Sequence, residues 1–529
     1  MVNKNIFSDS NDIFAVSIND AGGIAYSRNN LETLSQLILT GTFNNTFYVS
    51  GKTQFDRINS LLKNLSKEDI KFIAKLAIYA RKHGFMKDTP AFLTAWLSKN
   101  GPEYLDTVFN SVINNGKMLR NLVQIIRSGK VGRKSFGSHL KRLIQNWIIE
   151  SDQSKIISGC IGKKPSMADI LKMIHPRPKS LEQNSLFKWI LGVDMVSEEV
   201  EKLPQEIINL IRFRLNENTE IPNVPFELLT SQELSEENWK AIAKQSGWHM
   251  IRMNLNTFLR KGIFKDIEIT NLIAKRLSDP QEIYKAKILP YQIFTTWMNI
   301  SNEIPLIIKK SLEKALEYSI QTVPIFEGKT LIFVDVSGSM ISPITGRRKG
   351  STSKMRCVDV ASLIASSFLK VNPNNVEIVL FDTKIYRTKL NPENSVMENA
   401  EFLSSIGGGG TACQLPLIEE VNNKTRSNLI IYISDNESWF NLSGYYFNSE
   451  ENWKPQVVKA WKDFKIINPK AKMVCIDLQP NTTVQVRSYS DVLNIGGFSD
   501  VVYDVITDFI NNNSSKDFWI NRIKSSIDF

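Results

Sequence analysis

Residues 330–340 read TLIFVDVSGSM, and this stretch decides the fold of the C-terminal part of the chain. Its apolar run, rich in β-branched and aromatic residues, predicts a buried strand of a parallel sheet. Asp335, Ser337 and Ser339 then lie on the turn after the strand, where open α/β sheets bind their ligands. Three hard oxygen donors at alternating positions suit Mg²⁺. The alternative is a Ser/Gly turn whose hydroxyls only cap backbone groups.

Two later segments favour the metal site over the simple turn. Gly407–Gly410 form a flexible loop that places Thr411 just before a helical pattern. Residues 428–438, NLIIYISDNES, again show a predicted strand followed by an acidic residue, and this strand ends at Asp435. This order of motifs resembles the metal-ion-dependent adhesion site of von Willebrand factor A (vWA) domains. The resemblance implies one Mg²⁺ ion with a position open for a partner's carboxylate, which is a docking site rather than a catalytic centre. Its expected ligands are Asp335, Ser337, Ser339, Thr411 and Asp435.

The rest of the C-terminal part alternates between strand and helix patterns. An apolar stripe at helical spacing runs through residues 355–369, and further helices are expected at QVVKAWKDFKII and DVVYDVITDFI. The expected strands are VEIVLFDT, IYRTKL, LIIYIS, KMVCIDLQ and VLNIGGF. Such alternation predicts a mostly parallel sheet covered on both faces. We therefore expect a vWA-like domain over residues 327–529.

Residues 1–326 carry apolar residues at helical spacing nearly throughout. Segments such as DIKFIAKLAIYARK, SFGSHLKRLIQNWIIE and EITNLIAKRL are separated by short loops with Gly, Pro, Asn or Ser. Serial helix pairs of this kind predict an α-solenoid, which offers a long curved surface. At 529 residues the chain is long enough for two or more domains. The predicted fold class is therefore a multidomain α plus α/β protein.

Basic charge is concentrated in one part of the chain. The net charge is +11, yet residues 326–529 hold 22 basic and 22 acidic residues, whereas Lys117–Lys188 hold 15 basic and 4 acidic ones. A local surplus of this density predicts a phosphate-binding surface, although solvated helix faces are the usual alternative. Trp147 falls on the apolar side of its helix and is expected in the core. No helix-turn-helix or zinc-finger pattern is evident, which favours single-stranded RNA over duplex DNA as the ligand. The candidates for the RNA face are Arg127, Lys130, Arg133, Lys134, Lys141 and Arg142, with Phe136 and His139 of the loop GRKSFGSH as stacking side chains.

Several classes of protein are disfavoured. The four cysteines and four histidines are scattered, so neither a zinc site nor a disulfide framework is predicted. The N-terminus lacks a signal-like apolar run and no stretch is long enough for a membrane span. A monomeric, soluble, cytoplasmic protein is expected, without a membrane partner. No general acid–base pair is visible, so we expect no enzyme. A metal-dependent protein-binding scaffold without an RNA role is the alternative function.

The whole pattern resembles the TROVE family. The matching segments are GTFNNTFYVSG, YARKHGFMKDTPAFLTAWL, SGKVGRKSFGSHLKRLIQNW, ILKMIHPRPKS, NWKAIAKQSGWHMIRMNLNTF and AKILPYQIFTTWM, followed by DVSGSM, GGTACQLPL, SDNES and GGFSDVVYDVITDFI. They cover the chain from about Asp12 to Phe529 in the order that the family has them, and YARKHGFMKDTP is more similar to bacterial or phage members than to animal ones.

The resemblance implies a ring of HEAT-like helix pairs, residues 1–326, closed by the vWA domain. It implies a ribonucleoprotein in RNA quality control, with single-stranded 3′ ends of misfolded RNA in the ring's hole and Y-like RNA on the outer basic surface. An exoribonuclease or another protein is implied as a partner at the metal site. His175 in HPRPK takes the place of a Y-RNA-contacting histidine, and Ser158 and Gly162 stand where members can carry Lys and Arg. The same basic stretch includes Lys163, Lys164 and Lys172.

Overall fold

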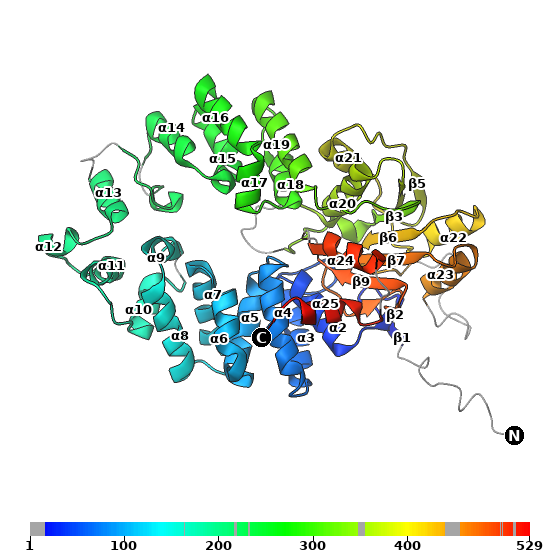
Figure 1. Cartoon of the computed structure of the whole chain (residues 1–529), viewed down its shortest axis with the longest axis horizontal. Coiled ribbons are helices and arrows are strands. Elements are labelled where there is room, and N and C mark those ends of the chain that lie inside the picture. Colours follow the sequence, from blue (N-terminus) through cyan, green and yellow to red (C-terminus); the bar gives the residue numbers. More distant parts are fainter. Residues whose placement is uncertain are drawn as a thin grey trace. The chain divides into compact units, whose positions relative to one another are not determined.

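The protein is described by a computed structural model, shown in Figure 1. It describes residues 16–162, 164–215, 220–230, 233–347, 355–439, 455–497, 499, 501–511 and 515–528. The chain divides into two compact units: residues 1–65, 289–298 and 316–526 form the first, and residues 66–288, 299–315 and 527–529 form the second. The first 65 residues thus group with the C-terminal part of the chain. A domain boundary at residue 326 stays a prediction.

A six-stranded sheet forms the centre of the first unit. Its strand order is β5-β4-β3-β6-β7-β9, with every neighbouring pair parallel except β4 and β5. The bounds are β3 (Thr330–Asp335), β4 (Val376–Phe381), β5 (Ile385–Arg387), β6 (Leu429–Ser434), β7 (Lys472–Asp477) and β9 (Val492–Gly496). All of these strands lie within the segments expected from the sequence. Because the chain runs outward from β3 to β4 and then returns to β6 on the other side, the strand order reverses between β3 and β6, where such sheets bind ligands.

Helices pack on this sheet and bury it. Residues of β3, β4, β6 and β7 form one apolar cluster with Leu417 of α22 and with Trp461 and Phe464 of α23. Helix α20 contacts β3, β4 and β6, and its Phe368 packs edge-to-face on Tyr503 of α24. The bounds are α20 (Cys357–Val371), α21 (Val396–Leu403), α22 (Leu415–Asn422), α23 (Gln456–Ile467), α24 (Val501–Asn511) and α25 (Phe518–Ser525). The predicted parallel sheet with helical covering is confirmed.

The N-terminal segment adds a second, three-stranded sheet to the first unit. A hairpin of β1 (Val16–Ile18) and β2 (Ile24–Ser27) pairs with β8 (Thr483–Val484), in the order β1-β2-β8. Helices α2 (Asn30–Thr40) and α3 (Gly51–Lys63) follow it. The side chains of Arg28 and Asp477 form a buried ion pair that fixes the segment to the end of β7. The nearly all-helical expectation is therefore wrong here, although the turn Asn19–Gly23 is a hairpin signal.

The second unit is helical among its described residues. Its α-helices are α4 (Asp69–Lys82), α5 (Asp88–Asn100), α6 (Leu105–Val112), α7 (Gly116–Arg127), α8 (Gly137–Glu150), α9 (Gln153–Gly159), α10 (Met167–Ile174), α11 (Leu181–Leu191), α12 (Ser197–Val200), α13 (Gln205–Arg214), α14 (Glu236–Gln245), α15 (Trp248–Arg260), α16 (Ile267–Leu277) and α17 (Pro280–Ala286). Helices α18 (Pro290–Asn299) and α19 (Leu306–Ser319) each have residues in both units.

Helix α7 shows how the sequence builds this unit. The Asn115 side chain accepts a hydrogen bond from Met118 N and caps the helix, and Leu119, Leu122 and Ile126 are buried on one face. Helices close in sequence pack on one another, as α4 does on α5 and α6, α5 on α7, and α7 on α9 and α10. The mostly helical N-terminal region expected from the periodicity is confirmed. No helix within the described residues is long and apolar enough to cross a membrane.

Candidate metal centre and candidate nucleic-acid interface

Asp335 ends β3 and begins the candidate metal centre. Its Oδ1 accepts a 2.9 Å hydrogen bond from Ser337 N, so the carboxylate itself shapes the turn that carries both serines. The hydroxyls of Ser337 and Ser339 lie 3.2 Å apart. All three side chains are buried. The turn therefore gathers one carboxylate and two hydroxyls at one point of the sheet edge, as the sequence predicts.

The glycine loop that precedes Thr411 is fastened to this turn. Gly408 N donates to the carbonyl of Val336, and Gly338 N donates to the carbonyl of Gly409, both at 2.8 Å. Gly407 has φ +103, and a Cβ there would lie 2.3 Å from the Val336 carbonyl oxygen, so only glycine fits. The buried Thr411 follows directly. These hydrogen bonds hold the loop so that Thr411 lies at the same end of the sheet as Asp335.

Asp435 follows β6, the strand next to β3, and completes the group. Its side chain hydrogen-bonds with Ser339, and its Oδ1 accepts from Glu437 N at 3.3 Å. Its Oδ2 is buried without a hydrogen-bond partner among the described atoms. Burial, followed by the neighbouring Asp435 charge, raises the pKa of Asp335 to about 7, and burial raises the pKa of Asp435 to about 6. Two buried carboxylates close together repel each other unless a proton or a cation lies between them.

The donor set fits a hard divalent cation. Two carboxylates, several hydroxyls and one buried carboxylate oxygen without a partner match the oxygen-only chemistry of Mg²⁺. Within the part of the chain that the structure describes, no three or more His, Cys, Asp or Glu side chains form a group that could hold a metal. Any ion here would therefore depend on the hydroxyls of Ser337, Ser339 and Thr411 for its shell.

Two further residues orient this site, and neither was predicted from the sequence. Ser434 Oγ donates a 2.6 Å hydrogen bond to Asp335 Oδ2. Asp382, after β4, accepts from Gly409 N at 3.0 Å and from the Tyr386 hydroxyl at 2.8 Å. Ser434 therefore fixes the first carboxylate, and Asp382 fixes the glycine loop. In the sequence, the only indication of their role is that Ser434 and Asp382 lie at the ends of the strand segments that form β6 and β4.

The candidate RNA face lies on α7, α8, α10 and the loop between α7 and α8. Helix α10 packs on both α7 and α8, so these elements share one part of the second unit. Among the described residues, Arg127, Lys134, Lys141 and Arg142 make no ion pair with an acidic side chain, and Lys141 is partly exposed while the other three are exposed. Lys130, Lys164, Lys172 and His175 are also exposed. Lys163 lies outside the described residues.

Among the predicted RNA-face residues, Arg133 and His139 have structural partners and Phe136 is buried. Arg133 donates from Nη1 to the Ser98 carbonyl at 2.9 Å and from Nε to the Ser135 carbonyl at 2.7 Å. His139 Nε2 pairs with Asp106, an acidic neighbour from outside the basic stretch. Phe136 is only 9% exposed. The expectation of a stacking Phe136 is therefore corrected, because its ring is part of the core just before α8.

Trp147 and His175 take up distinct positions. Trp147 is partly buried rather than part of the core as expected, and its Nε1 donates to the Ile113 carbonyl at 2.7 Å, so the ring has a structural partner. His175 ends α10 with a left-handed backbone, φ 53, and its side chain is exposed. The Gln145 side chain donates to the Ile174 carbonyl at 2.9 Å and to the His175 carbonyl at 3.3 Å, which ties this turn to α8.

A second group of cations, which the sequence did not predict, surrounds Lys87. Burial lowers the pKa of Lys87, and the neighbouring charges of Lys117, Arg81 and Arg252 lower it further against the opposing effect of Asp88. These residues are far apart in sequence but belong to one compact unit. Lys87 is nonetheless exposed at the surface, and an amine surrounded by like charges favours an anionic ligand, because each bound phosphate would relieve the repulsion.

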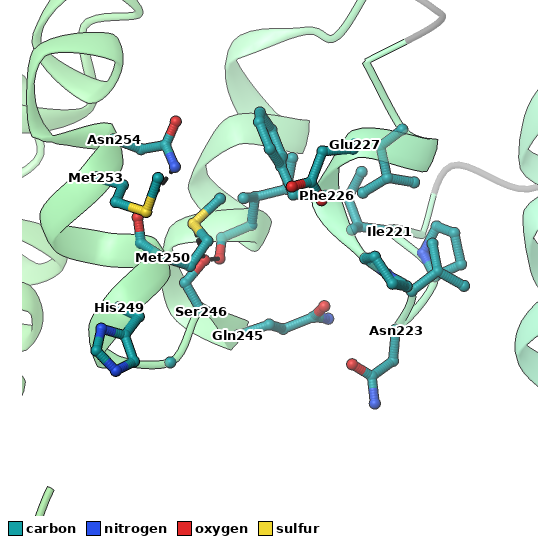
Figure 2. A pocket seen from close by; sticks show the side chains of 16 residues that line it. Ile221, Asn223, Phe226, Glu227, Gln245, Ser246, His249, Met250, Met253 and Asn254 are labelled. Carbon is teal, nitrogen blue, oxygen red and sulfur yellow. Dashed lines mark hydrogen bonds between the residues drawn. The ribbon is translucent and has the colours of Figure 1, made fainter. Parts of the chain in front are cut away.

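A pocket of about 420 Å³ adjoins this group through His249. Figure 2 shows Met250 and Met253 of α15 on one side of the pocket, with Ile221 and Phe226 on the other. His249 Nε2 lies 3.0 Å from the Ala286 carbonyl, and Arg252 Nε lies 3.5 Å from His249 Nδ1. Burial, followed by Arg252, lowers the pKa of His249. The imidazole at this rim therefore stays neutral at neutral pH.

Comparisons with known proteins find relatives of this chain. Residues 329–510 match the Ro60 vWA domain family. The RNA-binding protein RO60 of Deinococcus radiodurans is 21% identical over 457 residues, which cover 80% of this chain and 83% of the relative. The RNA-binding protein RO60 of Caenorhabditis elegans is 20% identical over 449 residues, covering 72% of this chain and 67% of the relative.

A solved structure is similar in fold as well. The crystal structure of the Deinococcus radiodurans RO (RSR) protein aligns with a TM-score of 0.63 and 16% identity, covering 91% of this chain and 99% of that chain. An identity this low supports a shared fold and nothing finer. The resemblance to the Ro, or TROVE, family that the motifs predict is therefore confirmed, in the vWA domain by the family model and along the chain by relatives similar in sequence and in fold.

Proposed function

We propose that this chain binds RNA through its helical unit and serves as the protein component of a ribonucleoprotein, without catalysis of its own. The observation that carries the proposal is the exposed basic face of α7, α8 and α10, where Arg127, Lys134, Lys141 and Arg142 make no ion pair with a described acidic residue. Such a surface attracts phosphates and releases counterions when it binds them. The RNA-binding proteins RO60 that resemble this chain support the same role.

Two classes of RNA fit two parts of the helical unit. A structured, Y-like RNA fits the face of α7, α8 and α10, because shape and backbone contacts suffice for folded RNA. A single-stranded 3′ end of a misfolded RNA fits the Lys87 group and the adjoining pocket, where phosphates meet cations and a base meets Met250, Met253 and Phe226. This division supports a part for the protein in RNA quality control. A monomer in the cytoplasm is proposed along with it.

The metal centre is proposed as a docking site for a protein partner. Asp335, Ser337, Ser339, Thr411 and Asp435 would hold Mg²⁺, which supplies a Lewis-acidic position for a partner's carboxylate when it is bound. An exoribonuclease that acts on the bound RNA is one partner of suitable function. We expect no reaction at the site, because its described residues include no histidine or lysine beside the carboxylates to move a proton.

The decisive experiment is crosslinking of the full-length protein to RNA in its source cell, followed by sequencing of the recovered RNA. We expect structured non-coding RNA, with crosslinks in α7, α8 and α10, and separate crosslinks of 3′ ends near Lys87. Recovery of protein partners without any enrichment of RNA would favour the scaffold function instead.

A further inference from the structure

The turn Thr46–Val49 of the N-terminal segment lies at the candidate metal centre. Thr46 N donates to the Val49 carbonyl at 2.9 Å, and Val49 N donates to Thr46 Oγ1 at 3.2 Å, which closes a tight turn. Phe47 and Tyr48 form its tip, and their rings meet edge to face with centroids 4.8 Å apart. The tip therefore presents two aromatic rings of fixed relative orientation.

This turn is anchored to the loop that follows the Asp335 turn. Thr42 Oγ1 and Asn44 Nδ2 both donate to the Thr345 carbonyl, at 2.7 and 2.8 Å. Asn45 and Arg347 exchange two backbone hydrogen bonds as an isolated antiparallel bridge. The whole segment belongs to the same compact unit as the sheet. Residues about 300 positions apart are thus joined at the rim of the site.

The Tyr48 phenol reaches the group of predicted ligands. Ser339 is its hydrogen-bond partner, and the charges of Asp435, Glu437 and Asp335 lie close enough to act on it. A tyrosine phenol has an ordinary pKa of about 10, so it is protonated and neutral at neutral pH. A neutral phenol is a poor ligand for a hard cation but a good hydrogen-bond donor. It is half-buried, whereas Asp335 and Ser339 are buried, so it lies toward the open side of the site.

We propose that Tyr48 completes the docking site by donating a hydrogen bond to the carboxylate that takes the open position of the metal ion. The inference rests on the proposed metal site. It adds Tyr48, a residue outside the vWA motif, as a contact for the carboxylate that binds there. A carboxylate bound to the ion has one oxygen toward the metal, and its second oxygen is free to accept a hydrogen bond. Because Asp335 and Asp435 lie close by, a hydrogen-bond donor such as the Tyr48 phenol is needed to stabilise that second oxygen. The N-terminal segment thereby becomes part of the partner-binding surface.

The test uses the full chain, with Mn²⁺ as the metal and acetate as the carboxylate. Binding of Mn²⁺ is followed by the loss of the free-ion EPR signal at increasing acetate, with ionic strength held constant by chloride. In the wild-type protein acetate should strengthen Mn²⁺ binding. In Tyr48→Phe the acetate concentration that gives half of the strengthening of Mn²⁺ binding should rise by about tenfold or more. This is the effect expected when a hydrogen bond to a charged group is lost. The affinity for Mn²⁺ without acetate should change by less than about threefold.

Matched variants keep the result specific. Tyr489→Phe, at a half-exposed tyrosine away from the motif, should behave as wild type. Asn44→Ala loosens the anchor of the turn and leaves the phenol intact, so it should give a smaller loss in the same direction. The inference would be overturned if Tyr48→Phe and the wild-type protein showed the same acetate dependence. It would also be overturned if Tyr48→Phe lost Mn²⁺ binding in the absence of acetate. Absence of Mn²⁺ binding by the wild-type protein would overturn it together with the metal site, while RNA binding by the same samples tests the proposed function separately.

Discussion

Ser434 and Asp335 join the two strands at which the order of the sheet reverses. The Ser434 hydroxyl donates a 2.6 Å hydrogen bond to Asp335 Oδ2, and both side chains are buried at the ends of β6 and β3. Because the hydroxyl fixes one oxygen, the Asp335 carboxylate can turn toward a cation in only one way. A residue that orients a metal ligand in this way can affect metal affinity as strongly as some direct ligands do.

Ser434→Ala should therefore weaken the metal site without unfolding the protein. Loss of this donor is expected to lower Mn²⁺ affinity by about 10- to 100-fold, the usual effect of removing a residue that orients a ligand. Titration of Mn²⁺ by EPR measures it. Ser405→Ala is the control, at an exposed serine whose hydroxyl donates to the Phe402 carbonyl at the end of its own helix. Equal Mn²⁺ affinities in both variants would show that Asp335 does not need Ser434.

The stability of the metal-free protein should depend on pH through Asp335 and Asp435. Burial raises both pKa values above the ordinary value of 3.8, so the folded state holds protons that the unfolded state has lost. Stability from this pair is therefore full at low pH and falls as pH rises from about 4 to about 7. A Mg²⁺ ion bound at the proposed site would replace those protons, so EDTA should lower the melting temperature more at pH 7.5 than at pH 5.5. Equal effects of EDTA at both pH values would contradict the site, and Asp435→Asn should abolish the difference.

The parts of the site that the sequence predicts are those whose chemistry follows directly from the end of a strand. Asp335, Ser337, Ser339 and Asp435 gather because β3 and β6 are parallel neighbours, and each strand is visible as an apolar run. Ser434 and Asp382 escape prediction because a single hydroxyl or carboxylate near a strand end has no distinguishing pattern. Tyr48 escapes because its place depends on backbone bonds to residues about 300 positions away.

The helical part shows the same limit. Its periodicity predicts the helices well, because one apolar stripe suffices to bury each of them. It does not predict which loop residues turn inward. Phe136 lies in a basic, glycine-bounded loop, yet the left-handed backbone of Gly137 starts α8 with the ring in the core. The Lys87 group is equally invisible, since its cations come from α4, α7, α15 and the loop before α5.

RNA binding should depend on the cations of the α7–α8 face. Replacing Arg127, Lys134, Lys141 and Arg142 together with Ala should weaken binding of unrelated structured RNAs and flatten the salt dependence. The wild-type affinity should fall by roughly 10³ or more between 50 and 200 mM salt if six or more phosphates are contacted. Filter binding across a salt series measures both. A matched quadruple change of Lys389, Lys459, Lys462 and Lys470, exposed in the other unit, should leave binding unchanged.

Arg133 should behave differently from its neighbours. Its guanidinium donates to the backbone carbonyls of Ser98 and Ser135, so it fastens the α7–α8 loop to the end of α5. Arg133→Ala should lower the free energy of unfolding by about 1–3 kcal/mol, because two carbonyls lose a charged donor. Thermal unfolding with Lys134→Ala as the control measures this. Unchanged stability together with weakened RNA binding would instead return Arg133 to the RNA face.

Recognition of a single-stranded 3′ end should depend on Lys87. Its amine lies among Arg81, Lys117 and Arg252, and a phosphate that enters this group relieves their mutual repulsion. The wild-type protein should bind an RNA with a free 3′ tail more tightly than a blunt duplex of equal length. Lys87→Ala should remove most of that preference and leave affinity for the blunt duplex nearly unchanged, because the α7–α8 face stays intact. Competition gel shifts at matched salt measure both RNAs, with Lys99→Ala as a control at a lysine that bonds to the Gly132 carbonyl. Equal losses for tailed and blunt RNA would show that Lys87 acts as one more general phosphate contact, and no preference in the wild-type protein would exclude a separate site for 3′ ends.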